Sequence, residues 1–79
     1  MDRTVLQNRR LEVARSLRHW RSIRGYTQSE LADELGVPQS WVSNIESSAR
    51  RLDVVEAEVI CDVLGISISQ LLDNRGSSK

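Results

Sequence analysis

Several residue types that mark particular protein classes are scarce in this 79-residue chain. It has one cysteine, one histidine, one proline, one methionine and no phenylalanine. A single cysteine cannot form an internal disulfide, which excludes a disulfide-stapled scaffold, and one histidine beside one cysteine offers no zinc-ligand set. The glycine-rich patterns that bind nucleotide phosphates are also missing. We therefore expect no metal, no cofactor and no enzymatic activity.

Long apolar runs are missing as well. No segment approaches the roughly 18–20 apolar residues that cross a bilayer, and the N-terminus MDRTVLQNRR is charged where a signal peptide would be apolar. The length suits one small domain, whose core needs help from self-association. We expect a cytoplasmic protein.

The net charge is zero, but the charges are unevenly distributed. Residues 1–24 hold seven arginines against Asp2 and Glu12, a local balance of +5, whereas residues 25–49 hold four acids and no base. A local positive field is compatible with an anionic partner, so the zero sum excludes little.

Helix signals cover most of the chain. Leu6, Val13, Leu17 and Trp20 recur on one stripe of a helix predicted over residues 5–24, which Gly25 ends. Capping boxes open three further helices, because a Thr, Asp or Ser is followed three residues later by Glu or Gln. Pro38 suits the first turn of another. The predicted helices after the first span residues 28–35, 38–47, 54–64 and 68–72. The sequence thus predicts an all-α bundle of five helices.

The helix predicted over residues 38–47 has an unusual outer face. Solvated helix surfaces are normally rich in Glu, Lys and Arg, but this face carries short, uncharged hydrogen-bonding side chains. Such a face suits hydrogen bonding to a partner. Its members are Gln39, Ser40, Ser43, Asn44 and Ser47.

Two short helices joined by Leu35-Gly36-Val37 describe a helix-turn-helix, whose second helix enters the DNA major groove. The stretch RGYTQSELADELGVPQSWVSNIES, followed by RRLDVVEAEVICDVLGIS, resembles the Cro/C1-type (XRE-like) helix-turn-helix family over about residues 14–72. The resemblance implies a lambda-repressor-like DNA-binding fold. The chain then divides into an N-terminal extension at 1–13 that continues into the first helix, the domain at 14–73, and a disordered tail at 74–79.

The resemblance also implies roles for single residues. Gln28 would bind a phosphate and brace the second helix of the motif, and Ala32 would let the two helices approach. Arg21 and Glu46 would form a partly buried ion pair. The expected base-contacting residues are Gln39, Ser40, Ser43 and Asn44.

The chemistry of the amides supports this assignment independently. Asn and Gln side chains bond both N6 and N7 of adenine, which makes Gln39 and Asn44 the best candidates for direct readout. Other residues near helix ends suit contacts to the DNA backbone. This expected set is Thr27, Gln28, Trp41, Ser47, Arg50 and Arg51. Trp41 is an open case, since an aromatic at this position packs inside the protein equally often.

Two departures from the family pattern qualify these roles. Ser48 stands where relatives often have glycine, so either the following loop differs or the helix extends, and the phosphate role of Arg50 and Arg51 is less secure. The N-terminal extension either prolongs the first helix or reaches along the DNA as an arm.

Residues outside the motif have less specific interpretations. Trp20 and Cys61 are expected in the core, and His19, Arg15 and Arg18 on the solvated surface.

The sequence thus predicts a sequence-specific DNA-binding transcriptional regulator, repressor or Cro-like, associated with the nucleoid. One recognition helix reads too few base pairs for genomic specificity, so we expect a homodimer on a palindromic operator. Part of an apolar C-terminal set is expected to form the dimer interface: Ile66, Ile68, Leu71 and Leu72. The alternative is an antitoxin or anti-repressor that acts mainly by binding a protein partner.

Overall fold

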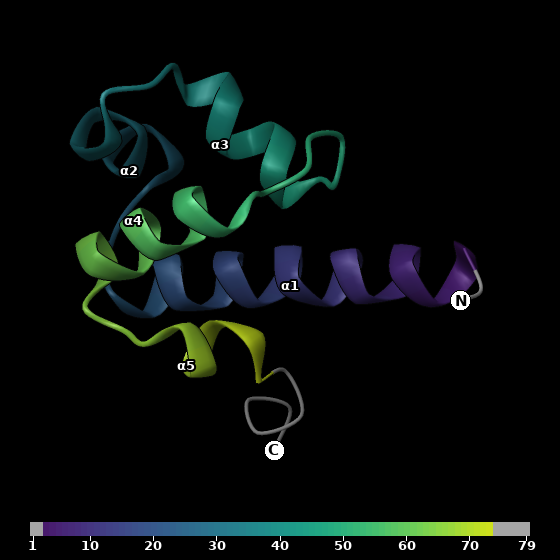
Figure 1. Cartoon of the computed structure of the whole chain (residues 1–79). Helices are drawn as coiled ribbons and strands as arrows, with labels where there is room; N and C mark the ends of the chain where they lie inside the picture. Colours follow the sequence, from purple (N-terminus) through teal and green to yellow (C-terminus); the bar gives the residue numbers. More distant parts are fainter. Residues whose placement is uncertain (1–2, 74–79) are drawn as a thin grey trace.

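The computed structural model describes residues 3–73, over which it contains five α-helices and no β-strand. In chain order they are α1 (Arg3–Ile23), α2 (Gln28–Leu35), α3 (Gln39–Glu46), α4 (Val54–Leu64) and α5 (Ile68–Leu72). α1 runs along the molecule, with α2, α3 and α4 on one side of it and α5 on the other (Figure 1). The predicted all-α, five-helix fold is confirmed.

The core lies where the five helices meet, and each helix contributes to it. Leu17 of α1, Leu31 of α2, Val42 of α3, Ile60 of α4 and Leu71 of α5 are each at most 1% exposed. Burial of these side chains is the main favourable contribution to folding, at roughly 1.5–3 kcal/mol each.

The helix termini follow the capping signals. Thr27, Asp53 and Ser67 each accept a hydrogen bond from the backbone N–H three residues later, and the side chain at that position bonds back. Gly36 and Gly65 end α2 and α4 in the left-handed conformation, which glycine adopts without strain. Pro38 is the N-cap of α3 and therefore lies just before the helix, not within its first turn.

The N-terminal half of α1 extends beyond the core. Its buried residues, Ala14, Ser16 and Leu17, all follow residue 13, whereas Val5 and Leu6 are exposed. Residues 3–13 thus continue the first helix of the domain. The arginine at position 9 is bonded within the protein, donating to Glu12 and to the backbone oxygen of Leu72. The predicted disordered tail at 74–79 lies outside the described residues.

Three residues outside the motif sit as the sequence predicted. Trp20 packs against the core, and its Nε1 donates to the carbonyl of Gln70 at 3.2 Å, which ties α1 to α5. Cys61 is 2% exposed, and this burial raises the pKa of its thiol. His19 is exposed on α1.

Candidate nucleic-acid interface

α2 and α3 pack closely through a short turn. The turn glycine, Gly36, has φ of 72°, and its N–H bonds back to the carbonyls of Ala32 and Asp33. The next N–H, that of Val37, also donates to the Ala32 carbonyl, at 3.0 Å. Ala32 itself is 1% exposed, so a small side chain fills the space beneath the turn. The geometry is that of a helix-turn-helix.

α3 divides into a core face and an exposed face. Val42 and Ile45 are buried, 1% and 3% exposed, and they anchor the helix to the bundle. Gln39, Ser40 and Asn44 are exposed on the opposite face. Ser43 is half-buried and donates to the carbonyl of Ser40 at 3.2 Å. The structure therefore presents three of the four predicted base-contacting side chains together, with the fourth at their edge.

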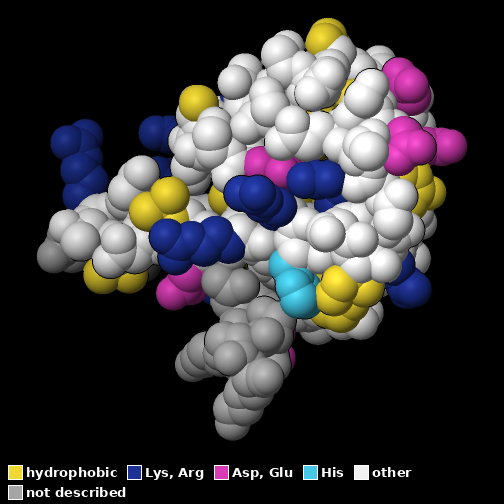
Figure 2. All heavy atoms as spheres, turned by 180° about the vertical axis from the view of Figure 1, so that it is seen from behind, with side chains coloured by type: hydrophobic (Ala, Val, Ile, Leu, Met, Phe, Trp, Pro, Cys, Tyr) yellow, Lys and Arg dark blue, Asp and Glu magenta, His cyan; other side chains and the backbone are white. Residues whose placement is uncertain are grey.

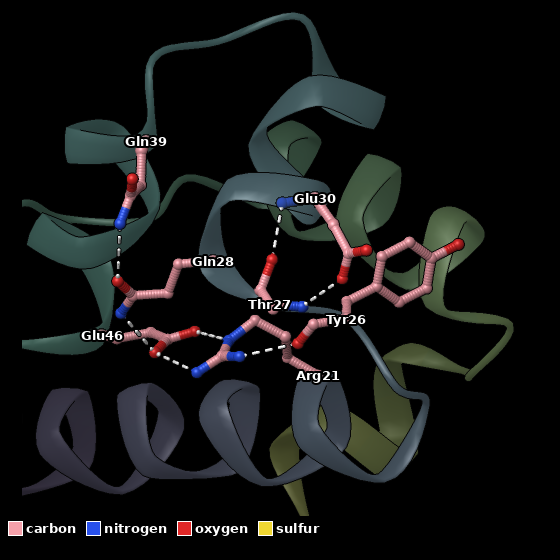
Figure 3. Close-up of polar contacts among 7 residues, drawn as sticks. All are labelled: Arg21, Tyr26, Thr27, Gln28, Glu30, Gln39 and Glu46. Atoms are coloured by element: carbon pink, nitrogen blue, oxygen red, sulfur yellow. Dashed lines mark hydrogen bonds and ion pairs between the residues drawn. The ribbon is translucent and has the colours of Figure 1, made fainter.

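A hydrogen-bonded chain fixes α3 against α1 and α2 (Figure 3). The guanidinium of Arg21 donates to both carboxylate oxygens of Glu46, at 2.6 Å through Nε and 3.1 Å through Nη2. Gln28 donates to the same carboxylate at 3.0 Å and accepts from Gln39 at 3.5 Å. The side chains of Arg21 and Glu46 are 13% and 4% exposed. The ion pair implied by the family resemblance is therefore present, and Gln28 braces α3.

The start of α2 is organised from the same arginine (Figure 3). Arg21 Nη1 donates to the carbonyl of Tyr26 at 2.7 Å, which holds the segment that leads into the helix. Thr27 Oγ1 then accepts from the N–H of Glu30 at 3.0 Å, and the Glu30 carboxylate accepts from the N–H of Thr27 at 2.9 Å. The exposed residues Thr27 and Ser29 thus lie on a rigid helix N-terminus, where N–H groups favour anions.

The loop after α3 turns through a left-handed residue. α3 ends at Glu46 and Ser48 has φ of 65°, the conformation that glycine adopts more easily. The helix is therefore not extended, and the turn expected of a glycine is made by serine. Ser47, the C-cap of α3, is exposed and donates its hydroxyl to the Asn44 carbonyl at 3.2 Å.

Arg50 is held within the protein by this loop. Its guanidinium donates to the two carboxylate oxygens of Glu56 at 3.0 and 2.8 Å and lies 4.7 Å from the ring centre of Trp41. The hydrogen bonds from Arg50 and from the Asp53 backbone lower the pKa of Glu56 to about 2. The hydrogen bond with Glu56 raises the pKa of Arg50 in turn. Arg51 is exposed and has no ion-pair partner within residues 3–73.

Sequence reasoning missed this Arg50–Glu56–Trp41 cluster. Glu56 was recognised only as the closing residue of a capping box, and Trp41 was left open between a DNA contact and internal packing. The structure shows Trp41 half-buried against the core with Arg50 over its ring. The left-handed turn at Ser48 precedes this cluster, and nothing in the local sequence pattern specifies such a turn at a serine.

Positive charge on α1 collects away from α3. Arg15 and Arg18 are exposed, as expected, and line a shallow hollow with His19 and Ser22. Figure 2 shows arginines on the face around this histidine. Over residues 3–73 there is no cluster of His, Cys, Asp or Glu that could hold a metal ion. No helix in this range is long and apolar enough to span a membrane.

The residues expected at the dimer interface divide into two groups. Ile66 is 8% exposed and Leu71 is fully buried, so both belong to the core of the monomer and have no surface to offer a partner. Ile68 is half-buried, and Leu72 is 41% exposed. The expectation that the interface includes Ile66 and Leu71 is wrong for this fold, because α5 uses them to close the bundle.

Comparison with known sequences places this geometry in a family context. A family model of a helix-turn-helix domain matches residues 12–72. The HTH-type transcriptional regulator SinR of Bacillus subtilis is 31% identical over 64 residues, which cover 80% of this chain and 58% of the relative. SinR of Bacillus licheniformis is 28% identical over 68 residues, 85% of this chain and 61% of the relative. The chain therefore spans about three fifths of the length of these relatives.

Solved structures of two similar proteins share the whole fold. An XRE-family like protein from Pseudomonas syringae pv. tomato superposes with a TM-score of 0.81 at 38% identity, covering 96% of this chain and 93% of the other. The hypothetical transcription factor NHTF from Neisseria gives a TM-score of 0.79 at 28% identity, covering 92% and 87%.

Proposed function

Because this chain belongs to the XRE-like helix-turn-helix family, we propose that it is a sequence-specific DNA-binding transcriptional regulator, repressor or Cro-like. In this proposal α3 lies in the major groove of a palindromic operator. The observation that carries it is the exposed, uncharged face of α3, held in position by the chain of hydrogen bonds from Arg21 through Glu46 and Gln28 to Gln39.

Base recognition falls to the amides of α3. Asn44 is exposed and makes no side-chain hydrogen bond within residues 3–73, so both its donor and its acceptor are available to an adenine edge. Gln39 donates weakly to Gln28 at 3.5 Å, which orients the amide and leaves it able to exchange partners. Ser40 and Ser43 serve either kind of base edge. Each bidentate contact discriminates by about 1–3 kcal/mol.

Backbone contacts position the domain. Thr27 and Gln28 lie at the N-terminus of α2, and Ser47 and Arg51 lie beyond α3, so the two groups flank the recognition helix. Arg51 is the loop cation best able to meet a phosphate. Arg50 and Trp41 contribute by holding the loop in shape, since their side chains are engaged with Glu56 and with each other.

A homodimer completes the proposal. Two copies of α3 would read half-sites about 34–36 Å apart, which supplies the specificity that one short helix lacks. The protein would then act in the cytoplasm on nucleoid DNA.

Selection from a randomised duplex library at two salt concentrations tests this function. We expect an inverted repeat with half-sites one helical turn apart, lost in the double variant Gln39→Ala/Asn44→Ala. The matched control is Gln7→Ala/Asn8→Ala, which removes the same two amides from exposed positions on α1. The control should retain the wild-type motif.

Two results would overturn the proposal. Retention that is sequence-blind and disappears at modest salt would indicate only counterion release, and a pull-down for a protein partner would follow. A motif that survives the Gln39→Ala/Asn44→Ala substitution unchanged would show that α3 does not read the bases.

A further inference from the structure

An apolar groove lies on the side of the molecule where α1 projects. It has a volume of about 390 Å³ and is bounded by the N-terminal half of α1, the loop after α3, the first turns of α4, and α5. Its apolar lining includes Leu6, Val13, Val54, Ala57, Ile68 and Leu72. Figure 1 shows that the N-terminal half of α1 continues past α4 and α5 here, with no other helix covering it.

The groove is edged by the most exposed apolar side chains of α4 and by others from α1 and α5. Val54 is 83% exposed, Leu6 42% and Leu72 41%. Val5, at 56%, and Val55, at 67%, lie next to these in sequence. Contiguous apolar surface on a small protein marks an interaction site, because its exposure to water is unfavourable.

We propose that a second copy of this chain occupies the groove, so that the groove is the dimer interface. This inference rests on the proposed function only in that a homodimer is needed to read two half-sites. It replaces the predicted interface at Ile66 and Leu71, which the core has taken, with surface that the monomer leaves uncovered. Of the predicted set, Ile68 and Leu72 remain in it.

The charges around the groove favour a second copy over a foreign peptide. Of its cations, Arg9 is paired with Glu12 and Arg50 with Glu56, whereas Arg10 and Arg51 have no ion-pair partner within residues 3–73. The acids Asp53 and Glu58 also line the groove without an ion pair in that range. The remaining charges are therefore two of each sign.

Balanced charges are self-complementary under a two-fold axis. In an isologous dimer each surface meets its own copy, so Arg10 and Arg51 of one copy can face acids of the other. A purely acidic peptide would leave Asp53 and Glu58 opposed, and a purely basic one would oppose the arginines. The chain's own residues 74–79, NRGSSK, have no apolar side chain to fill the groove.

The position of the groove agrees with operator binding. Ile45 and Ser48, at the end of α3 and just beyond it, also line the groove. A two-fold axis through it would place the two copies of α3 on either side of that axis. The groove spans four structural elements, as expected of an interface that takes about 800 Å² from each partner.

Sedimentation velocity from low to high micromolar concentration tests the inference on the full chain. We expect a dimer that Val54→Glu weakens by about 30-fold or more, the effect of losing an interface hot spot. The matched control is Ile23→Glu, since Ile23 is 58% exposed on α1 but does not line the groove. It should dimerise like the wild type, and far-UV circular dichroism should show both variants folded.

A charge swap sharpens the test. Arg10→Glu and Glu58→Arg should each weaken the homodimer, and mixing the two variants should restore association as a heterodimer. A strict monomer at high micromolar concentration, with and without DNA, would overturn the inference, and so would dimerisation that Val54→Glu leaves unchanged.

DNA binding separates this inference from the proposed function. Monomeric Val54→Glu should still bind a duplex carrying one half-site, whereas Gln39→Ala/Asn44→Ala should stay dimeric and lose the motif. Loss of sequence-specific binding by a dimeric wild type would refute the function alone. Full operator binding by a dimer insensitive to Val54→Glu would refute the groove alone.

Discussion

Two arginine–glutamate pairs flank α3, and they differ in burial and in what they connect. Arg21–Glu46 is nearly buried, with side chains 13% and 4% exposed, and it joins α1 to α3 across 25 residues. Arg50–Glu56 is 37% and 25% exposed and joins a loop to α4 across six residues. Both are bidentate. The first therefore sets the orientation of the recognition helix, and the second fixes the loop that follows it.

The difference lies in what remains when one partner is lost. A buried charge without its partner cannot recover its hydration, whereas a more exposed one is stabilised by water. The two pairs should therefore respond differently to substitution, to pH and to loop geometry.

Removing the carboxylate of the buried pair should have the largest effect. Glu46→Ala leaves the Arg21 guanidinium unpaired and takes the acceptor from Gln28, so we expect a loss of about 3–5 kcal/mol in the free energy of unfolding. Urea denaturation followed by circular dichroism measures it. The control is Arg21→Met/Glu46→Leu, which leaves no buried charge and should cost much less. A loss below about 1 kcal/mol for Glu46→Ala would show that the pair is not the clamp that its burial indicates.

The exposed pair should appear in the pH dependence of stability. Glu56 has a pKa of about 2 in the folded protein, below its ordinary 4.5, so the folded state favours the ionised form. The resulting stability is fully present above pH 4.5 and is lost as the pH falls toward 2. Glu56→Gln should therefore be less stable at neutral pH and lose less stability over that range, as measured by thermal melts.

The control for this experiment is Glu58→Gln on the same helix. Glu58 is exposed and has no ion pair within residues 3–73, so its acid limb should follow the wild type. A wild-type acid limb in Glu56→Gln would contradict the role assigned to the pair.

The sequence predicted the first pair and missed the second for a physical reason. Arg21 and Glu46 lie on regular helices whose bounds follow from capping and periodicity, and the motif's resemblance to a known family then placed the two side chains opposite each other. Arg50 reaches Glu56 from an irregular loop that turns at a left-handed serine. Loop dihedrals depend on tertiary contacts, which periodicity does not encode.

The same limit applies to the dimer surface. Apolar character at positions 66–72 was visible in the sequence, but its division between core and surface depends on which face α5 turns to α1. The structure buries Ile66 and Leu71 and exposes Leu72. The groove itself joins residues from opposite ends of the chain, so no local pattern predicts it.

Relieving the left-handed serine should sharpen the comparison from the opposite direction. Ser48→Gly removes the strain of φ 65° while keeping the loop path to Arg50, so we expect stability to rise by up to about 1 kcal/mol. Ser47→Gly is the matched control, because Ser47 has φ of −89° and gains only unfolded-state entropy from glycine. It should lower stability. Equal effects of the two substitutions in urea denaturation would exclude strain at Ser48.

A third pair, Arg9–Glu12, extends the comparison to the fully solvated limit. Its atoms are 2.9 Å apart, closer than one contact of the buried pair, but the side chains are 46% and 48% exposed. If burial and not distance decides the energetic importance of these pairs, Glu12→Gln should cost at most about 0.5 kcal/mol in urea denaturation, and added salt should reduce even that. Arg9 keeps its hydrogen bond to the Leu72 carbonyl in this variant, so α1 stays attached to α5. A cost comparable with that of Glu46→Ala would mean that geometry outweighs burial in this fold.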